Sequence, residues 1–205
     1  MPSIVTCGIP RSGSTLVWQM VQEVSSPISV HKVHPASWEV DQEALVFISI
    51  RDPRDVISSL LRVKLSREGR TGEQPTEEDL KNVLHHSEQS WLGLADLREV
   101  SQKVVLRYEH FYDDYNVIWD AIWAMLGIRP AANSRELIES QYNLLANIQR
   151  AQELKDFNEV DEANVHGDHI AQPIPGGWRK GIPGHLQDQV ANHVREVCWG
   201  WGYAK

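Results

Sequence analysis

The stretch Gly8-Ile-Pro-Arg-Ser-Gly-Ser-Thr15 decides the fold of this 205-residue chain. An apolar run at residues 3–7 precedes it, and a helix-like segment at residues 16–23 follows it. In the order strand, glycine loop, helix, the loop N–H groups and the helix N-terminus point at one spot, where the helix dipole favours negative charge. The stretch therefore predicts a cradle for a phosphate-like anion.

The loop departs from that of an ordinary nucleotide kinase. Its spacing is G-x-x-x-x-G-x-T, as in a Walker A loop. However, Ser14 stands where a kinase needs lysine, and the cation of the loop is Arg11, three residues earlier. We therefore expect a phosphate-like ligand other than Mg-ATP.

Bulk properties narrow the class of protein. A chain of 205 residues is expected to form one domain, residues 1–205, with a substantial core. The net charge of -8 argues against general binding to nucleic acid or to anionic membranes. Cys7 and Cys198 lie in apolar contexts, which is typical of buried free thiols in a reducing compartment. With neither a membrane-length apolar run nor a signal-peptide pattern visible, a cytoplasmic protein is expected.

The hydrophobic pattern alternates between strands and helices. We expect strands at residues 3–7, 27–33, 43–50 and 103–107, and helices at 14–24, 53–65, 76–100, 113–126, 134–154 and 186–199. Residues 66–75 are interpreted as a mobile loop, and 155–183 as mostly loop. This order predicts an α/β fold with a parallel sheet flanked by helices, which binds ligands at the carboxyl ends of its strands.

A second motif is Arg51-Asp-Pro-Arg-Asp55, with Ser59 two turns into the helix that follows. Arg51 at a strand end and Ser59 could hold a second phosphate with a guanidinium fork and a hydroxyl. An equally weighted alternative is that Arg51 pairs with a local carboxylate and that Ser59 lies on the helix surface.

Together these segments resemble the sulfotransferases that use PAPS (3′-phosphoadenosine 5′-phosphosulfate). The resemblance rests on residues 10–15 and on Arg51-Asp-Pro-Arg-Asp55 with Ser59 eight residues after Arg51. In addition, Leu106-Arg-Tyr-Glu-His110 and Met125-Leu-Gly-Ile128 are similar to the family's "RYEDL … FLG" segment, and Gly176-Gly-Trp-Arg-Lys-Gly181 to its late "G-x-W-(R/K)" segment. The resemblance is collinear from about residue 3 to the C-terminus.

The resemblance implies a P-loop nucleotide-binding, sulfotransferase-like domain that uses PAPS, releases PAP and needs no metal. Arg11 would neutralise charge on the oxygen that bridges phosphate and sulfur as the bond breaks. Arg51 and Ser59 would hold the 3′-phosphate, which ATP lacks. The implied PAPS-binding residues are Pro10, Arg11, Ser12, Gly13, Ser14, Thr15, Arg51, Ser59, Arg179, Lys180 and Gly181.

The acceptor hydroxyl needs a general base. Lys32-Val-His34 follows the second expected strand and resembles the "K-T-H" segment of cytosolic sulfotransferases, whose histidine is that base. Histidine titrates near neutrality, which suits proton abstraction. Lys32 would assist Arg11, or it is simply a strand-edge lysine. Alternatively, His34 is a polar loop residue and the base is a carboxylate, Glu39 or Asp41, as in other branches of the family.

The acceptor and the oligomeric state cannot be read from the sequence. A small-molecule or carbohydrate acceptor is expected at residues 35–41, 66–75, the helix after them, and 155–175. The histidine pairs of the H-x-x-H type do not make a metal site, which needs three or four ligands. The competing interpretations are a P-loop kinase of a small molecule and a non-catalytic nucleotide-binding protein of the same fold.

Overall fold

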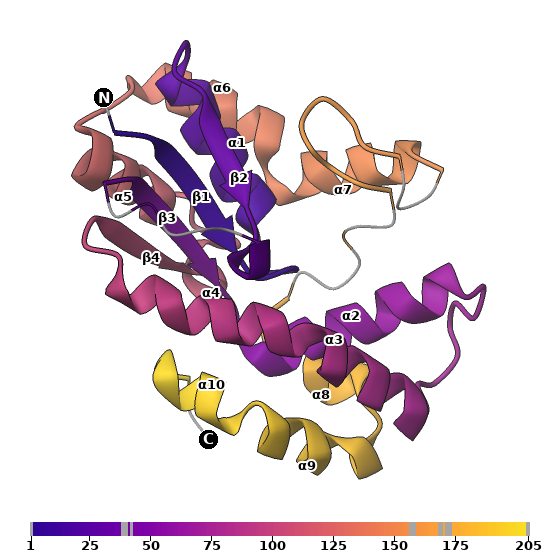
Figure 1. The fold of residues 1–205 in the computed structure, drawn as a ribbon. Helices are drawn as coiled ribbons and strands as arrows, with labels where there is room; N and C mark the ends of the chain where they lie inside the picture. The colour runs from indigo at the N-terminus through magenta and orange to yellow at the C-terminus, as the bar shows by residue number, and fades with distance from the viewer. Residues whose placement is uncertain are drawn as a thin grey trace.

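A four-stranded sheet forms the centre of the computed structural model, which describes residues 2–37, 41, 43–155, 159–167, 170 and 174–203 (Figure 1). The strand order is β2-β1-β3-β4, and every neighbouring pair is parallel. The strands are β1 (Ile4–Gly8), β2 (Val30–Val33), β3 (Leu45–Ile50) and β4 (Lys103–Arg107). The predicted α/β class and parallel sheet are therefore confirmed.

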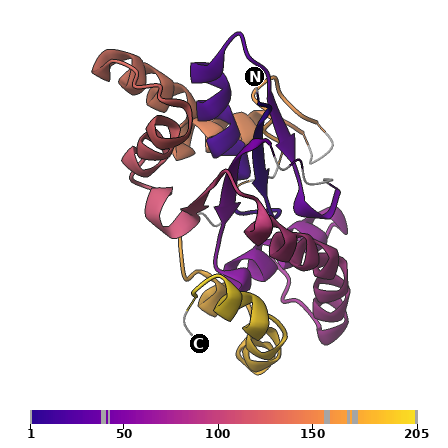
Figure 2. The same ribbon diagram turned by 60° about the vertical axis from the view of Figure 1, so that its left-hand side comes forward.

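Helices cover both faces of the sheet (Figures 1 and 2). One face packs against α1 (Ser14–Ser25), α5 (Asn116–Leu126) and α6 (Ala132–Tyr142). The other face packs against α2 (Pro53–Arg67), α3 (Glu77–Asp96) and the C-terminal helices α8 (Trp178–Gly181), α9 (Gly184–His193) and α10 (Arg195–Gly200). Short elements are η1 (Pro35–Ser37), η2 (Leu97–Glu99) and α4 (Tyr108–Phe111), and α7 (Leu144–Glu153) follows α6.

The apolar run of β3 is explained by this two-sided cover. Val46 and Ile48 belong to the core under α2 and α3, whereas Phe47 belongs to the core under α1 and α5. Successive side chains of a strand point to opposite faces, so a strand covered on both faces is apolar except where a polar side chain finds a partner, as Ser49 does in Ser12. Cys7 lies in the core under α2 and α3. Both Cys7 and Cys198 are buried free thiols, as predicted.

Several predicted helix ends are confirmed by their caps. The Asp52 side chain accepts a hydrogen bond from the Arg54 backbone N–H at 2.9 Å at the start of α2. Thr76 and Asp79 form a capping box at the start of α3. Gly127 ends α5 in the left-handed conformation, with φ of 67°.

Two predicted helices are each broken in two. The helix expected at residues 134–154 stops at Tyr142, and the Asn143 side chain accepts the Ala146 N–H to begin α7. An asparagine that can cap a new helix competes with helix continuation, which the hydrophobic pattern does not register. The helix expected at 186–199 divides at Val194 into α9 and α10, and α8 lies inside the segment interpreted as loop.

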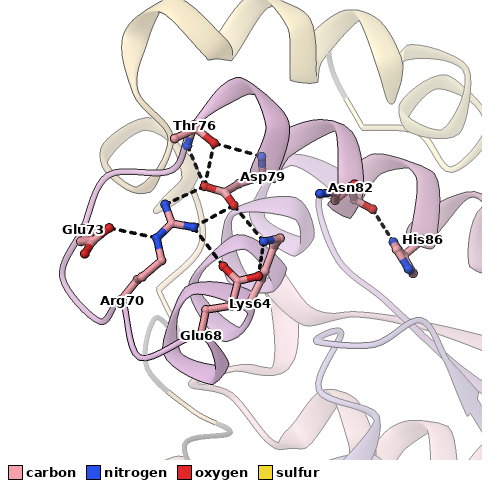
Figure 3. A network of polar contacts seen from close by, with 8 residues as sticks. All are labelled: Lys64, Glu68, Arg70, Glu73, Thr76, Asp79, Asn82 and His86. Carbon is pink, nitrogen blue, oxygen red and sulfur yellow. Dashed lines mark hydrogen bonds and ion pairs between the residues drawn. The ribbon is translucent and has the colours of Figure 1, made fainter.

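The loop at residues 66–75 is tied to α3, contrary to its interpretation as mobile (Figure 3). Arg70 donates to Asp79 at 3.0 Å and to Glu68 and Glu73 at 2.9 Å. Lys64 of α2 also binds Asp79, at 2.8 Å, and pairs with Glu68. The Arg70 and Lys64 bonds, with those of the Thr76 cap, hold the pKa of Asp79 well below its usual range. In the sequence, the charged residues of this segment look like a stretch that is exposed to water. In the structure they form one ion-pair network.

Within the described ranges, no helix has the length and apolarity needed to cross a membrane. The same described parts of the chain hold no group of three or more histidine, cysteine, aspartate or glutamate side chains placed to bind a metal ion.

Candidate active site

Four strand ends meet at one edge of the sheet. The glycine loop follows β1, His34 follows β2, Arg51 follows β3 and Tyr108 follows β4. Because all four strands are parallel, their carboxyl ends lie together, and the arrowheads of β1 and β3 point the same way in Figure 1. The predicted convergence of the glycine loop, His34 and Arg51 in one region is therefore observed.

The glycine loop is held in a bent conformation by its own contacts. Arg11 and Gly13 have φ of 72° and 80°, in the left-handed region. Ser12 is fully buried, and its hydroxyl donates to the Ile9 carbonyl at 2.8 Å and contacts the Ser49 hydroxyl at 2.9 Å. A Cβ at Gly13 would lie 2.8 Å from the Tyr108 ring, so only glycine fits there. The loop N–H groups are thereby pre-organised at the start of α1.

Arg11 links the two predicted anion sites. Its Nε donates to the Ser59 hydroxyl at 2.8 Å, across 48 residues of sequence. Burial, followed by the Arg62 and Arg51 guanidinium groups, lowers the pKa of Arg11 to about 9. Arg11 is therefore still a cation at neutral pH, within a group of like charges.

Arg51 is enclosed rather than exposed. Only 5% of the residue is accessible, and its guanidinium lies over the Tyr108 ring, 4.4 Å from the centroid. Its Nη1 donates to the Arg11 carbonyl at 3.4 Å, and its Nε is 3.9 Å from an Asp55 oxygen. Ser59 is only 3% accessible, so it is not a helix-surface residue. That these two residues hold a phosphate stays a prediction.

Asp55 fastens the late G-x-W segment to α2. Its two oxygens accept the backbone N–H groups of Gly176 at 2.7 Å and Trp178 at 2.8 Å. Arg179 lies over the Trp178 ring at 4.7 Å, and both Arg179 and Lys180 are exposed. The segment that carries Arg179, Lys180 and Gly181 is thus placed one helical turn from Ser59, and phosphate contacts from these three residues stay a prediction.

Lys32 and His34 face the glycine loop from β2. Lys32 Nζ donates to the Thr15 hydroxyl at 2.7 Å, and burial lowers the pKa of Lys32 to about 8. His34 Nδ1 lies 3.0 Å from the Gly8 carbonyl. Since a carbonyl only accepts, Nδ1 carries the proton, which leaves Nε2 of a neutral ring as an acceptor.

Glu39 and Asp41 are the two carboxylates that could act as the base in place of His34. Glu39 lies outside the described residues. Asp41 accepts hydrogen bonds from the Ser3 hydroxyl at 3.0 Å and from the Glu43 N–H at 2.9 Å. Both oxygens of Asp41 are therefore engaged in local contacts, whereas His34 Nε2 has no hydrogen bond to another described residue.

The fold is that of proteins crystallised with PAP. No family model matches the chain, and no curated protein matches its sequence. Among solved structures, retinol dehydratase in complex with androsterone and inactive cofactor PAP superposes with a TM-score of 0.69 at 13% identity, covering 96% of this chain and 80% of that one. Mouse sulfotransferase SULT7A1 complexed with PAP superposes with a TM-score of 0.64 at 12% identity, covering 98% and 87%. The chain has a sulfotransferase-like fold. At this identity the likeness concerns the fold, and the activity must be argued from the site.

A cavity adjoins the glycine loop of this sulfotransferase-like fold. It has a volume of about 360 Å³ and lies between α2 and α3. Ile9 and Pro10 of the loop form one end, and polar groups come from Lys64, Arg67, Glu68, Asn82, His86, Ser87 and Ser90. Its remaining walls are largely apolar, lined by Val56, Leu60, Val63, Val83 and Trp91. The cavity can therefore hold a mainly apolar small molecule beside Arg11. Among the segments predicted to contact substrate, residues 66–75 (through Arg67 and Glu68) and the helix after them line it.

Sequence reasoning assigned no role to three residues that lie beside the glycine loop or Ser59: Asp55, Arg62 and Tyr108. Arg62 follows Ser59 by three residues, which puts both on one face of α2, so the spacing alone could have identified it. Tyr108 directly follows a strand, as His34 and Arg51 do. Asp55 closes the Arg51-Asp-Pro-Arg-Asp55 motif, but its role could not be foreseen, because its partners at residues 176–178 lie more than a hundred positions away.

Proposed function

We propose that this protein transfers the sulfuryl group of PAPS to a hydroxyl or amine of an acceptor and releases PAP. The observation that carries the proposal is the hydrogen bond between Arg11 of the glycine loop and Ser59 beside Arg51. It joins two cationic sites, one at a helix N-terminus and one at a strand end. PAPS has an anionic group for each site, a 5′-phosphosulfate and a 3′-phosphate. ATP, in contrast, carries all its phosphates at the 5′ position of the ribose.

Arg11 supplies the charge that the transfer needs. As the acceptor oxygen forms a bond to sulfur, the bond from sulfur to the bridging oxygen breaks, and negative charge develops on the 5′-phosphate of PAP. A cation already placed at the loop stabilises that charge without reorganisation. Lys32, bound to Thr15 in the same loop, adds a second positive charge below pH about 8.

His34 takes the acceptor proton in this proposal. Its Nδ1–H donates to the Gly8 carbonyl, which fixes the ring and leaves the Nε2 lone pair available to accept a proton. The proton of the acceptor hydroxyl moves to Nε2, and the imidazolium then loses it to solvent. Protonation of His34 before acceptor binding would block this step.

The cavity between α2 and α3 is the proposed acceptor site. Its largely apolar walls favour a small molecule with an apolar body over a carbohydrate, because the polar side chains of the lining could replace only part of the hydrogen bonds that a sugar makes to water. The solved structure with androsterone, an apolar alcohol, agrees with an acceptor of this kind. The hydroxyl to be sulfated would lie at the Pro10 end, next to Arg11.

Ligand binding separates this function from a kinase and from a non-catalytic protein. We expect PAP to bind with equal affinity in EDTA and in Mg²⁺, and ATP with Mg²⁺ to bind at least tenfold more weakly in calorimetry. Mg²⁺-dependent ATP binding in preference to PAP would favour the kinase. PAP binding without turnover over a broad panel of acceptors, from phenols and sterols to sugars, would favour the non-catalytic protein.

A further inference from the structure

Arg62 lies against the second anion site but has no assigned role. It follows Ser59 by three residues on α2, and its Nη2 donates to the Ser59 hydroxyl at 3.3 Å. Its other terminal nitrogen, Nη1, is buried and has no hydrogen-bond partner among the described residues. A buried guanidinium nitrogen without a partner is costly unless a ligand supplies the acceptor.

The charges around Arg62 are of one sign. Within the described parts of the chain, no carboxylate lies within ion-pair distance of it, in contrast to Arg54 on the same helix, which binds Asp52 at 2.6 Å. Burial, followed by the neighbouring Arg51, lowers the pKa of Arg62. Among the like charges that lower the pKa of Arg11, Arg62 has the largest effect. Such a group of cations is relieved by an anion that contacts all of them.

The hydrogen bonds of Ser59 also indicate that an anion binds at this place. Its hydroxyl oxygen accepts from Arg11 Nε at 2.8 Å and from Arg62 Nη2 at 3.3 Å, so both lone pairs are in use. The remaining function of the hydroxyl is to donate its proton. An acceptor that receives the Ser59 O–H and the Arg62 Nη1–H together must carry several oxygens close to each other, as a phosphate does.

We infer that Arg62 is a further binding residue for the 3′-phosphate of PAP and PAPS, acting with Arg51 and Ser59. The inference rests on the proposed function, since the ligand is the one proposed there. Two guanidinium groups and a hydroxyl would then surround one phosphate from α2 and the end of β3. A doubly charged terminal phosphate can balance both guanidinium groups, which a singly charged sulfate ester or carboxylate cannot.

The experiment compares Arg62→Gln, Arg62→Lys and the wild type, with PAP and adenosine 5′-phosphosulfate as ligands in calorimetry. Arg62→Gln should weaken PAP binding by about 10- to 100-fold, the usual effect of losing a charge-assisted hydrogen bond. Adenosine 5′-phosphosulfate lacks the 3′-phosphate, so its affinity should change by less than about threefold. Arg62→Lys should recover part of the loss, because it keeps the charge but not the fork.

Two controls exclude a general effect of charge or of folding. Arg129→Gln removes one cation at the Trp123 end of α5, away from the site, and should leave both affinities unchanged. The ligand-free Arg62→Gln protein should melt at or above the wild-type temperature, because it loses a like charge and only one long hydrogen bond.

Specific outcomes overturn the inference. If the wild type binds PAP and Arg62→Gln binds it equally well, Arg62 has no such role although the proposed function stands. Equal losses for both ligands, or a lower melting temperature of the ligand-free variant, would show a structural role. A change in the KM of the acceptor with unchanged PAP affinity would place Arg62 at the acceptor site. If the wild type does not bind PAP at all, the proposed function fails and the inference fails with it.

Discussion

Replacing Asp55 tests how the late G-x-W segment is attached to the anion site. Asp55 is 2% accessible and accepts two backbone N–H groups, those of Gly176 and Trp178. Hydrogen bonds to a charged group contribute about 1.5–3 kcal/mol each. Asp55→Ala removes both, and the Trp178 N–H stays buried, so we expect the free energy of unfolding to fall by about 3–5 kcal/mol. Asp55→Asn keeps one acceptor oxygen and should lose about half as much.

Urea unfolding followed by circular dichroism measures these changes. The midpoint should fall in the order wild type, Asp55→Asn, Asp55→Ala, with an unchanged slope, since the surface exposed on unfolding stays the same. Asp120→Ala on the exposed side of α5 is the matched control and should change stability by less than about 0.5 kcal/mol. PAP affinity should fall in the same order, because Asp55 holds residues 176–178 against the helix of Ser59. Stability of Asp55→Ala equal to that of the Asp120 variant would refute the reasoning.

Three further predictions concern the proposed reaction. His34→Ala should lower turnover by about 10²–10⁴-fold with little change in PAP affinity; a variant that keeps the wild-type rate would exclude His34 as the base. Because burial lowers the pKa of Lys32 to about 8, its charge is present below that pH and is lost above it, so the rate should fall as pH rises through about 8. Lys32→Arg should move that alkaline limb upward, and an unmoved limb would assign it to another group. Arg51→Ala should weaken PAP binding without affecting adenosine 5′-phosphosulfate, whereas equal losses would indicate a structural role.

The sequence was sufficient wherever one local pattern decides the structure. The glycine loop, the buried run of β3, the Asp52 and Thr76 caps and the Gly127 helix end are each specified by adjacent residues, and each is confirmed. The parallel order of strands then required His34 and Arg51 to approach the loop.

Features that depend on distant partners could not be predicted. The ion-pair network of residues 66–75 needs α2 and α3 packed side by side before Arg70 can reach Asp79 (Figure 3). The hydrogen bond between Arg11 and Ser59 joins residues that are 48 positions apart in the sequence. The hydrogen bonds of Asp55 join residues that are more than a hundred positions apart. The break at Asn143 has a different cause, a local side-chain cap that the hydrophobic pattern does not register.

The central claim is tested most directly by sulfuryl transfer itself, using sulfur-labelled PAPS in EDTA with a panel of apolar alcohols and phenols. We predict a labelled product and stoichiometric PAP from the wild type, and a rate at least 100-fold lower from Arg11→Ala, whose PAP affinity should change far less than its rate. Transfer by Arg11→Ala at the wild-type rate would contradict the role of the loop cation. The absence of any product from a wild-type protein that binds PAP, with every acceptor on the panel, would contradict the claim that this protein is a sulfotransferase for such acceptors.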